Sequence, residues 1–132
     1  MEKRKYEFEF EINATPKLLY PYFATPGGLE QWFADSVVVD GDKVLEMEWD
    51  GETHYAKLTS QKIFKSVRYE FLDDNKKAER DPKYLELSMM KNEMTETYYL
   101  HVVDYTDNIV DENEQFDVWE SLVEELKSIV GG

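Results

Sequence analysis

The chain has 132 residues, no cysteine and a formal net charge of −14, with 29 acidic and 15 basic residues. The lack of cysteine excludes disulfide scaffolds, thiolate metal sites and cysteine nucleophiles, and the negative charge makes nucleic acids and anionic membrane surfaces poor partners. A chain of this length can form a core without metals or disulfides, so we expect one domain spanning residues 1–132.

The sequence also indicates where the protein works. The charged N-terminal residues are not followed by the apolar run of a signal peptide, and no stretch approaches the roughly 18 apolar residues of a membrane span. We therefore predict a cytoplasmic protein, and a monomer, because Lys and Glu on its strands oppose edge-to-edge pairing. The only basic cluster in the sequence is residues 3–5, so the remaining partner suggested by charge is a basic protein.

The first predicted element is a half-buried strand over residues 5–12, where Tyr6, Phe8, Phe10 and Ile12 alternate with charged residues.

A helical insert is predicted after this strand. Thr15 and Pro16 are typical of a helix start, and Pro21 should kink or shorten that helix. Its inward-facing residues are expected to be Leu18, Leu19, Tyr22 and Phe23. Residues 25–28 should break the helix, and residues 29–33 should form one or two further helical turns.

Six more strands are predicted from their alternating pattern, at residues 37–40, 44–49, 53–65, 67–71, 84–91 and 95–104. Residues 50–51 are a hairpin signal, and residues 73–82 should form an exposed loop. Trp49 and its apolar neighbours on the third strand point Glu46 and Glu48 outward. The register of residues 95–104 stays open, because both faces of that segment carry apolar or aromatic residues.

The last element is a long amphipathic helix over residues 111–130, with its apolar stripe at Phe116, Trp119, Val123, Leu126 and Val130. Asp111 with Glu114 can form a capping box, and Gly131 can end the helix. Short turns between strands predict an antiparallel meander, and the long helix must cover its apolar face. The sequence therefore predicts an α+β fold.

Six segments carry a resemblance to a known family. Residues 8–16 (FEFEINATP), 18–20 (LLY) and 25–35 (TPGGLEQWFAD) resemble the opening of a START-like domain, and residues 49–51 resemble its central hairpin. Residues 103–105 are similar to the end of its last strand, and residues 119–127 to its terminal helix.

Within the wider birch-pollen-allergen-like superfamily, the likeness is greatest to a bacterial subgroup near the homologues of the activator of heat-shock-protein ATPase. The resemblance implies a helix-grip architecture: a curved antiparallel sheet of about six or seven strands around the C-terminal helix, with a pocket between them. The superfamily includes lipid carriers, plant hormone receptors, polyketide cyclases and co-chaperones, so the fold alone does not assign an activity.

No catalytic pattern accompanies the fold. The six glycines form no phosphate-binding loop or nucleophile elbow, and the two imidazoles, His54 and His101, fall on different predicted strands. We therefore expect no catalytic residue, no metal and no cofactor. A cyclase or hydrolase using His54 or His101 as a general base is a third hypothesis.

The aromatic residues suggest a cavity, although core packing alone is the simpler interpretation. We predict a pocket that binds a small apolar or amphipathic, lipid-like molecule without catalysis. A co-chaperone-like protein–protein module is the alternative. The candidate ligand-binding residues are Trp32, Phe33, Trp49, His54, Tyr69, Tyr99 and Trp119.

Overall fold

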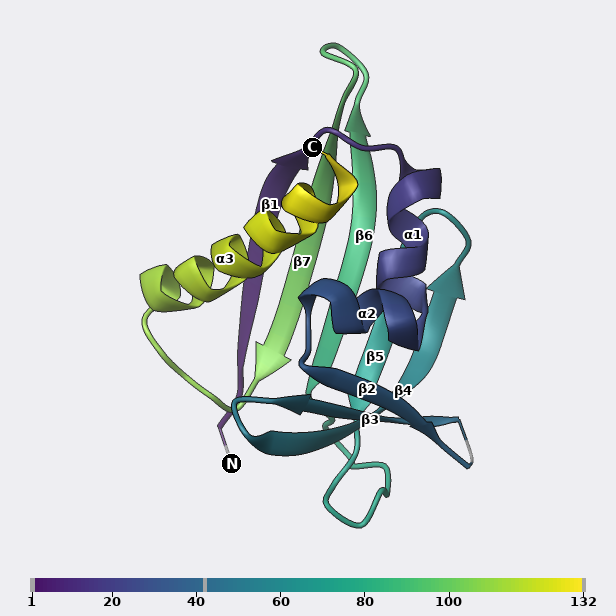
Figure 1. Ribbon diagram of the computed structural model, residues 1–132. Helices are drawn as coiled ribbons and strands as arrows, with labels where there is room; N and C mark the ends of the chain where they lie inside the picture. The colour runs from purple at the N-terminus through teal and green to yellow at the C-terminus, as the bar shows by residue number, and fades with distance from the viewer. Residues whose placement is uncertain (1, 42, 132) are drawn as a thin grey trace.

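The computed structural model describes residues 2–41 and 43–131, and its elements follow the predicted order (Figure 1). The strands are β1 (Arg4–Ile12), β2 (Ser36–Asp40), β3 (Val44–Trp49), β4 (Glu52–Lys62), β5 (Ser66–Phe71), β6 (Tyr84–Asn92) and β7 (Thr97–Thr106). The helices are α1 (Pro16–Ala24), α2 (Pro26–Trp32) and α3 (Glu112–Val130).

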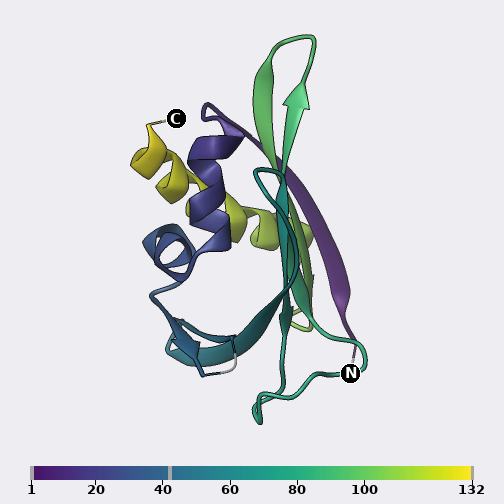
Figure 2. The ribbon, with the colours of Figure 1, turned by 90° about the vertical axis from the view of Figure 1, so that its right-hand side faces the viewer.

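The seven strands form one antiparallel sheet in the order β1-β7-β6-β5-β4-β3-β2. Consecutive strands from β2 to β7 are neighbours, while β1 joins the far edge beside β7. All three helices lie on the same side of the curved sheet, and α3 runs across β1, β7 and β6 (Figures 1 and 2). The helix-grip prediction is confirmed.

The structure settles the register of β7. Leu100 lies opposite Phe10 of β1 and Met89 of β6, and Val102 is flanked in the same way on both sides. Leu100 and Val102 are fully buried, so the even-numbered residues from Tyr98 to Asp104 face the helices. His101 consequently faces outward.

The end of β4 and the start of β7 differ from the predicted positions because of local turns. β4 ends at Lys62, where the Lys65 N–H donates to the Lys62 carbonyl oxygen and closes a turn. β7 begins at Thr97, because the Asn92 side chain accepts from the Met94 and Thr95 N–H groups and holds the preceding segment in a turn.

The predicted break between α1 and α2 is present but is shorter than residues 25–28, because only Thr25 is extended. α1 continues through Pro21 to Ala24, and α2 already begins at Pro26. Thr25 explains the immediate restart, because its hydroxyl oxygen accepts the Gly28 N–H at 2.9 Å and caps α2. Gly28 is required here, since a Cβ atom would lie 2.0 Å from the Pro21 carbonyl oxygen.

The inward face of α1 also differs from the prediction. Leu19, Tyr20 and Phe23 are buried, whereas Leu18 is 48% exposed and Tyr22 is half-buried. Leu19 and Tyr20 precede Phe23 by four and three residues, so the three side chains lie on one face of the helix. Leu18 therefore points away from the core.

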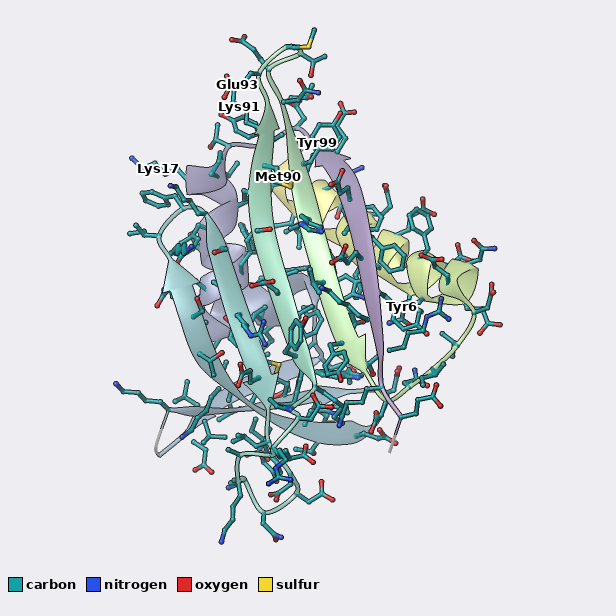
Figure 3. The ribbon with its side chains drawn as sticks, turned by 180° about the vertical axis from the view of Figure 1, so that it is seen from behind. Tyr6, Lys17, Met90, Lys91, Glu93 and Tyr99 are labelled. Carbon is teal, nitrogen blue, oxygen red and sulfur yellow. The ribbon has the colours of Figure 1, made fainter. Side chains whose placement is uncertain are left out.

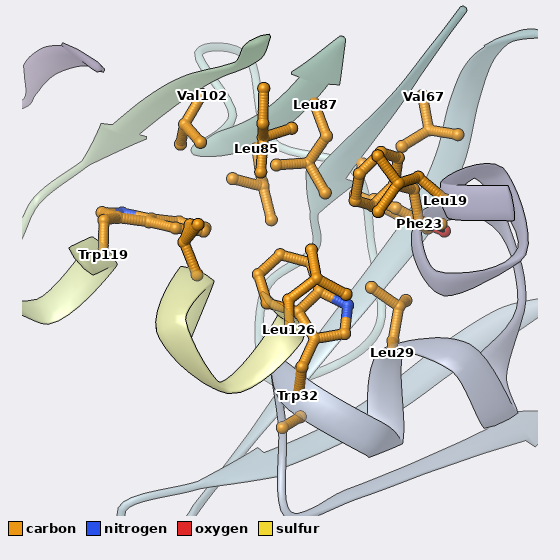
Figure 4. Close-up of a cluster of buried hydrophobic side chains, with 14 of the residues drawn as sticks. Leu19, Phe23, Leu29, Trp32, Val67, Leu85, Leu87, Val102, Trp119 and Leu126 are labelled. Atoms are coloured by element: carbon orange, nitrogen blue, oxygen red, sulfur yellow. Dashed lines mark hydrogen bonds between the residues drawn. The ribbon is translucent and has the colours of Figure 1, made fainter. Parts of the chain in front are cut away.

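α3 and the sheet share the main core. Trp119, Val123 and Leu126 are buried against the other helices and the inner strand faces (Figure 4). Asp111 caps the helix by accepting the Asn113 N–H at 3.2 Å, and Gly131 ends it with a φ of 82°.

Candidate functional site

A cleft of about 1370 Å³ lies between α3 and the end of the sheet where β5 and β7 finish and β6 begins. Its walls come from the end of α2 and the segment after it, the β3–β4 hairpin, the ends of β5 and β7, the start of β6 and residues 115–125 of α3. These segments meet because the sheet curves around α3, so the fold itself builds the cleft.

One wall is aromatic. Trp49 and His54 stack with ring centroids 3.8 Å apart and an interplanar angle of 12°. They come from the two sides of the β3–β4 hairpin, in which Trp49 lies opposite Glu52. Phe33 and Phe71 meet the Trp49 ring edge-to-face at 5.3 and 6.0 Å. These four side chains are only half-buried and line the cleft.

Behind this wall lies a second, buried aromatic layer. Trp32 and Trp119 are 4% and 3% exposed, and their ring centroids are 6.4 Å apart. The Trp32 indole N–H donates to the Tyr22 carbonyl oxygen at 2.9 Å, and Phe33 stacks on Trp119. This layer fixes the positions of the rings that face the cleft.

His54 places a polar atom in the aromatic wall. Its Nε2 atom is buried without a hydrogen-bond partner, and the Glu52 carboxylate oxygen Oε2 is 4.0 Å away. Burial, and secondarily the positive charge of Lys83, lowers the pKa of His54 below its ordinary value. The lowered pKa favours the neutral imidazole at pH 7, and 22% of the side chain is exposed beside the cleft.

Asp104 is the buried carboxyl group of the site. Its Oδ2 atom accepts the Gln115 side-chain N–H at 2.7 Å and the Trp119 indole N–H at 2.8 Å. Burial raises the pKa of Asp104 above its ordinary value, although both hydrogen bonds oppose this shift. The carboxyl group thereby fastens α3 to the end of β7.

The other charged residues that line the cleft are mostly acidic. Lys83 is the basic residue among the cleft-lining residues that the structure describes, and it lies 3.8 Å from Asp107. The acidic lining residues are Glu30, Asp35, Asp50, Glu52, Asp104, Asp107 and Glu125.

The cleft brings together five of the predicted site residues, Trp32, Phe33, Trp49, His54 and Trp119. Tyr69 lies elsewhere: it is buried in the core, and its hydroxyl donates to the Phe23 carbonyl oxygen at the end of α1. Burial raises the pKa of Tyr69. Tyr99 lies on the outer face of the sheet, paired with Glu11 and Met90 (Figure 3).

Sequence reasoning missed Phe71, Lys83, Asp104 and Gln115 as cleft residues. Asp104 could have been predicted if the register of β7 had been known, because a carboxylate on the inner face of a strand is often part of a site. Gln115 precedes the apolar stripe of α3, and Lys83 lies at the end of the 73–82 loop, so neither had a distinguishing pattern.

Residues 2–41 and 43–131 contain no group of three or more His, Asp or Glu side chains arranged to hold a metal ion. No helix in that part of the chain is long and apolar enough to span a membrane.

The curved sheet, the gripped helix and the cleft between them define a helix-grip domain. The chain belongs to the START-like superfamily, because the protein-family model of the START-like superfamily domain matches residues 1–132. No match was found among curated proteins.

Solved structures agree with this assignment. The Bacteroides fragilis protein BfR322 is 34% identical, with a TM-score of 0.59 and coverage of 98% of this chain and 92% of its own. The Aha1 dimer from Colwellia psychrerythraea is 15% identical, with a TM-score of 0.72 and 96% coverage of both chains. The Mesorhizobium loti protein MLL2253 is 14% identical, with a TM-score of 0.70 and 97% coverage of both. The last two show similarity of fold alone.

Proposed function

We propose that this protein binds a small apolar or amphipathic molecule in the cleft and does not transform it. The observation that carries the proposal is the half-buried aromatic wall of Phe33, Trp49, His54 and Phe71. START-like domains commonly bind hydrophobic ligands, and this wall offers the apolar surface that such a ligand needs. Each Å² removed from water contributes about 25 cal/mol before the costs of ordering the ligand.

Polar groups around the wall supply orientation. The half-buried His54 ring can form a hydrogen bond with a ligand, and Asp104 lies at the α3 side of the cleft. A few polar atoms within an apolar lining are typical of small-molecule sites. A general-base role would fall to His54, since His101 lies on the outer face of the sheet.

The charges favour a neutral or cationic ligand over a fatty-acid anion. Seven acidic residues line the cleft against one lysine, and Lys83 is already close to Asp107. A carboxylate entering this cleft would meet like charges in a partly buried setting, where screening is weak. An alcohol or an ammonium head group would not be repelled.

Native mass spectrometry of the protein purified from its own cells tests the proposal directly. A stoichiometric apolar compound, released on denaturation, is the expected result. A protein that carries nothing and also fails to bind the probes described next would overturn the proposal.

A matched pair of variants tests the site. The neutral probe N-phenyl-1-naphthylamine should bind the wild type and be displaced by dodecanol or dodecylamine more strongly than by laurate. Trp49→Ala should weaken the probe about 5- to 30-fold, the equivalent of about 1–2 kcal/mol of lost apolar contact. Tyr99→Ala, on the outer face, is the control and should bind as the wild type does. Equal affinities for the two variants would contradict the site.

The protein–protein hypothesis rests on the likeness of fold to the Colwellia Aha1 structure, and 15% identity transfers no partner. Binding to a basic client that weakens as salt is added would favour it over the ligand-binding proposal.

A further inference from the structure

The charge of the chain is distributed unevenly. Residues 13–29 and 53–69 contain none of the 29 acidic residues, yet they carry Lys17, Lys57, Lys62, Lys65 and Arg68. In a protein with a net charge of −14, these two stretches are basic in sequence. The two stretches correspond to α1 with the start of α2, and to β4 with most of β5. In the sheet, Arg68 pairs with Glu70 and Lys57 lies opposite Glu70, so the basic residues that remain are those nearer the β4–β5 turn and the start of α1.

Contacts bring the exposed ends of these stretches together. The Phe64 ring, in the β4–β5 turn, meets the Tyr20 ring of α1 edge-to-face at 5.7 Å. The Met89 N–H of β6 donates to the Lys65 carbonyl oxygen at 2.8 Å, which holds the turn beside the sheet. Figure 3 shows Lys17 at this same end of the molecule.

Apolar side chains protrude between the lysines. Ile63 is 69% exposed, Leu18 48% and Phe64 41%. Phe64 holds a φ of 60°, a backbone conformation that bulky residues rarely adopt, so the turn presents its aromatic ring at a cost. We define the basic tip as Lys17, Leu18, Lys62, Ile63, Phe64 and Lys65.

We propose that the basic tip docks the protein onto the surface of an anionic lipid bilayer. A narrow β-turn with protruding Ile and Phe side chains suits insertion among lipid head groups, and the adjacent lysines complement anionic lipids. A protein partner would instead need a broad, complementary patch of roughly 800 Å². The proposal concerns a surface contact made by side chains and is independent of the cleft.

The overall negative charge does not prevent this contact. The β3–β4 turn, with Asp50 and Glu52, and the 73–82 loop lie toward the opposite end of the sheet from the β4–β5 turn (Figure 1). At physiological salt, exposed charges farther apart than about 8 Å are largely screened. Glu11 and Glu96 share a small hollow with Leu18, so the contact is centred on the β4–β5 turn.

Vesicle flotation tests the proposal with the full chain. Vesicles of phosphatidylglycerol and phosphatidylcholine in equal parts should carry the protein upward, more weakly as salt is added, whereas phosphatidylcholine vesicles should not. Lys62→Glu/Lys65→Glu should weaken binding at least about tenfold. Ile63→Ser/Phe64→Ser should also weaken binding while leaving its salt dependence in place.

The matched control is Lys77→Glu/Arg80→Glu, two exposed basic residues of the 73–82 loop, which changes the net charge equally. This control and Trp49→Ala should float as the wild type does, and circular dichroism checks that every variant is folded. Absence of flotation by the wild type would overturn the proposal, whether the tip then binds an acidic protein or a second copy of the chain. Equal loss in the two charge-reversal pairs would overturn it too.

Discussion

Replacing Asp104 tests how α3 is fastened to the sheet. In Asp104→Ala, the Trp119 indole N–H and the Gln115 side-chain N–H lose their shared acceptor while both residues stay buried. Hydrogen bonds to a charged group contribute about 1.5–3 kcal/mol each, and relief from burying the carboxyl offsets part of this loss. We expect Asp104→Ala to lower the free energy of unfolding by about 2–4 kcal/mol.

Asp104→Asn separates the hydrogen bonds from the charge. The Asn carbonyl oxygen can accept both N–H groups, so this variant should stay within about 1 kcal/mol of the wild type at pH 7. The folded pKa of Asp104 is raised above its ordinary 3.8, so the folded wild type holds this proton more tightly. The wild type therefore loses stability relative to the Asp104→Asn variant as pH rises from 3.8 through the folded pKa of Asp104. Above that pKa, the difference in stability between the two proteins is constant.

Urea unfolding at several pH values measures both effects, provided that the slope of free energy against urea stays the same. A cost below about 1 kcal/mol for Asp104→Ala, or an equal cost for Asn and Ala, would refute the proposed fastening role.

Three further predictions follow from local geometry. Gly28→Ala should destabilise the protein by at least about 2 kcal/mol in urea unfolding, because its Cβ would meet the Pro21 carbonyl oxygen, whereas Gly27→Ala, with open space around it, should be neutral or slightly stabilising. An NMR titration of His54 should give a midpoint below pH 6.5, because its folded pKa is lowered. The stability that depends on the neutral ring is therefore complete above pH 6.5 and is lost as pH falls from 6.5 through that midpoint. A midpoint at or above 6.5 would contradict the burial of the ring. Leu126 is fully buried on the inner face of α3, so Leu126→Ala should cost about 2–5 kcal/mol by thermal or urea unfolding. A cost under about 1 kcal/mol would mean that α3 is not packed as described.

The fold could be predicted because its two decisive patterns are local. The alternation from Tyr6 to Ile12 and the three- and four-residue spacing from Trp119 to Leu126 each specify a buried face without information from elsewhere in the chain. Leu18 shows the limit of this reasoning. In a short helix with several apolar residues, the neighbours in space decide which of them is buried.

The site could be predicted only where a turn fixed the geometry. Asp50 and Gly51 predicted the hairpin that stacks Trp49 on His54. Tyr69 and Tyr99 carried no comparable information, because an aromatic residue on a strand suits either face of a sheet. Pairing with β1 and β6 decides the direction of Tyr99, and those contacts join distant parts of the sequence.

The position of β1 beside β7 has a consequence for biosynthesis. Arg4 pairs with Thr106, and the Tyr6 hydroxyl bonds both the carbonyl and the N–H of Val110, 104 residues away. During translation, β1 must wait for nearly the whole chain before it can pair, and such long-range closure slows folding. The glutamates that alternate along β1 keep its unpaired edge charged during that wait, which opposes its pairing with other nascent chains.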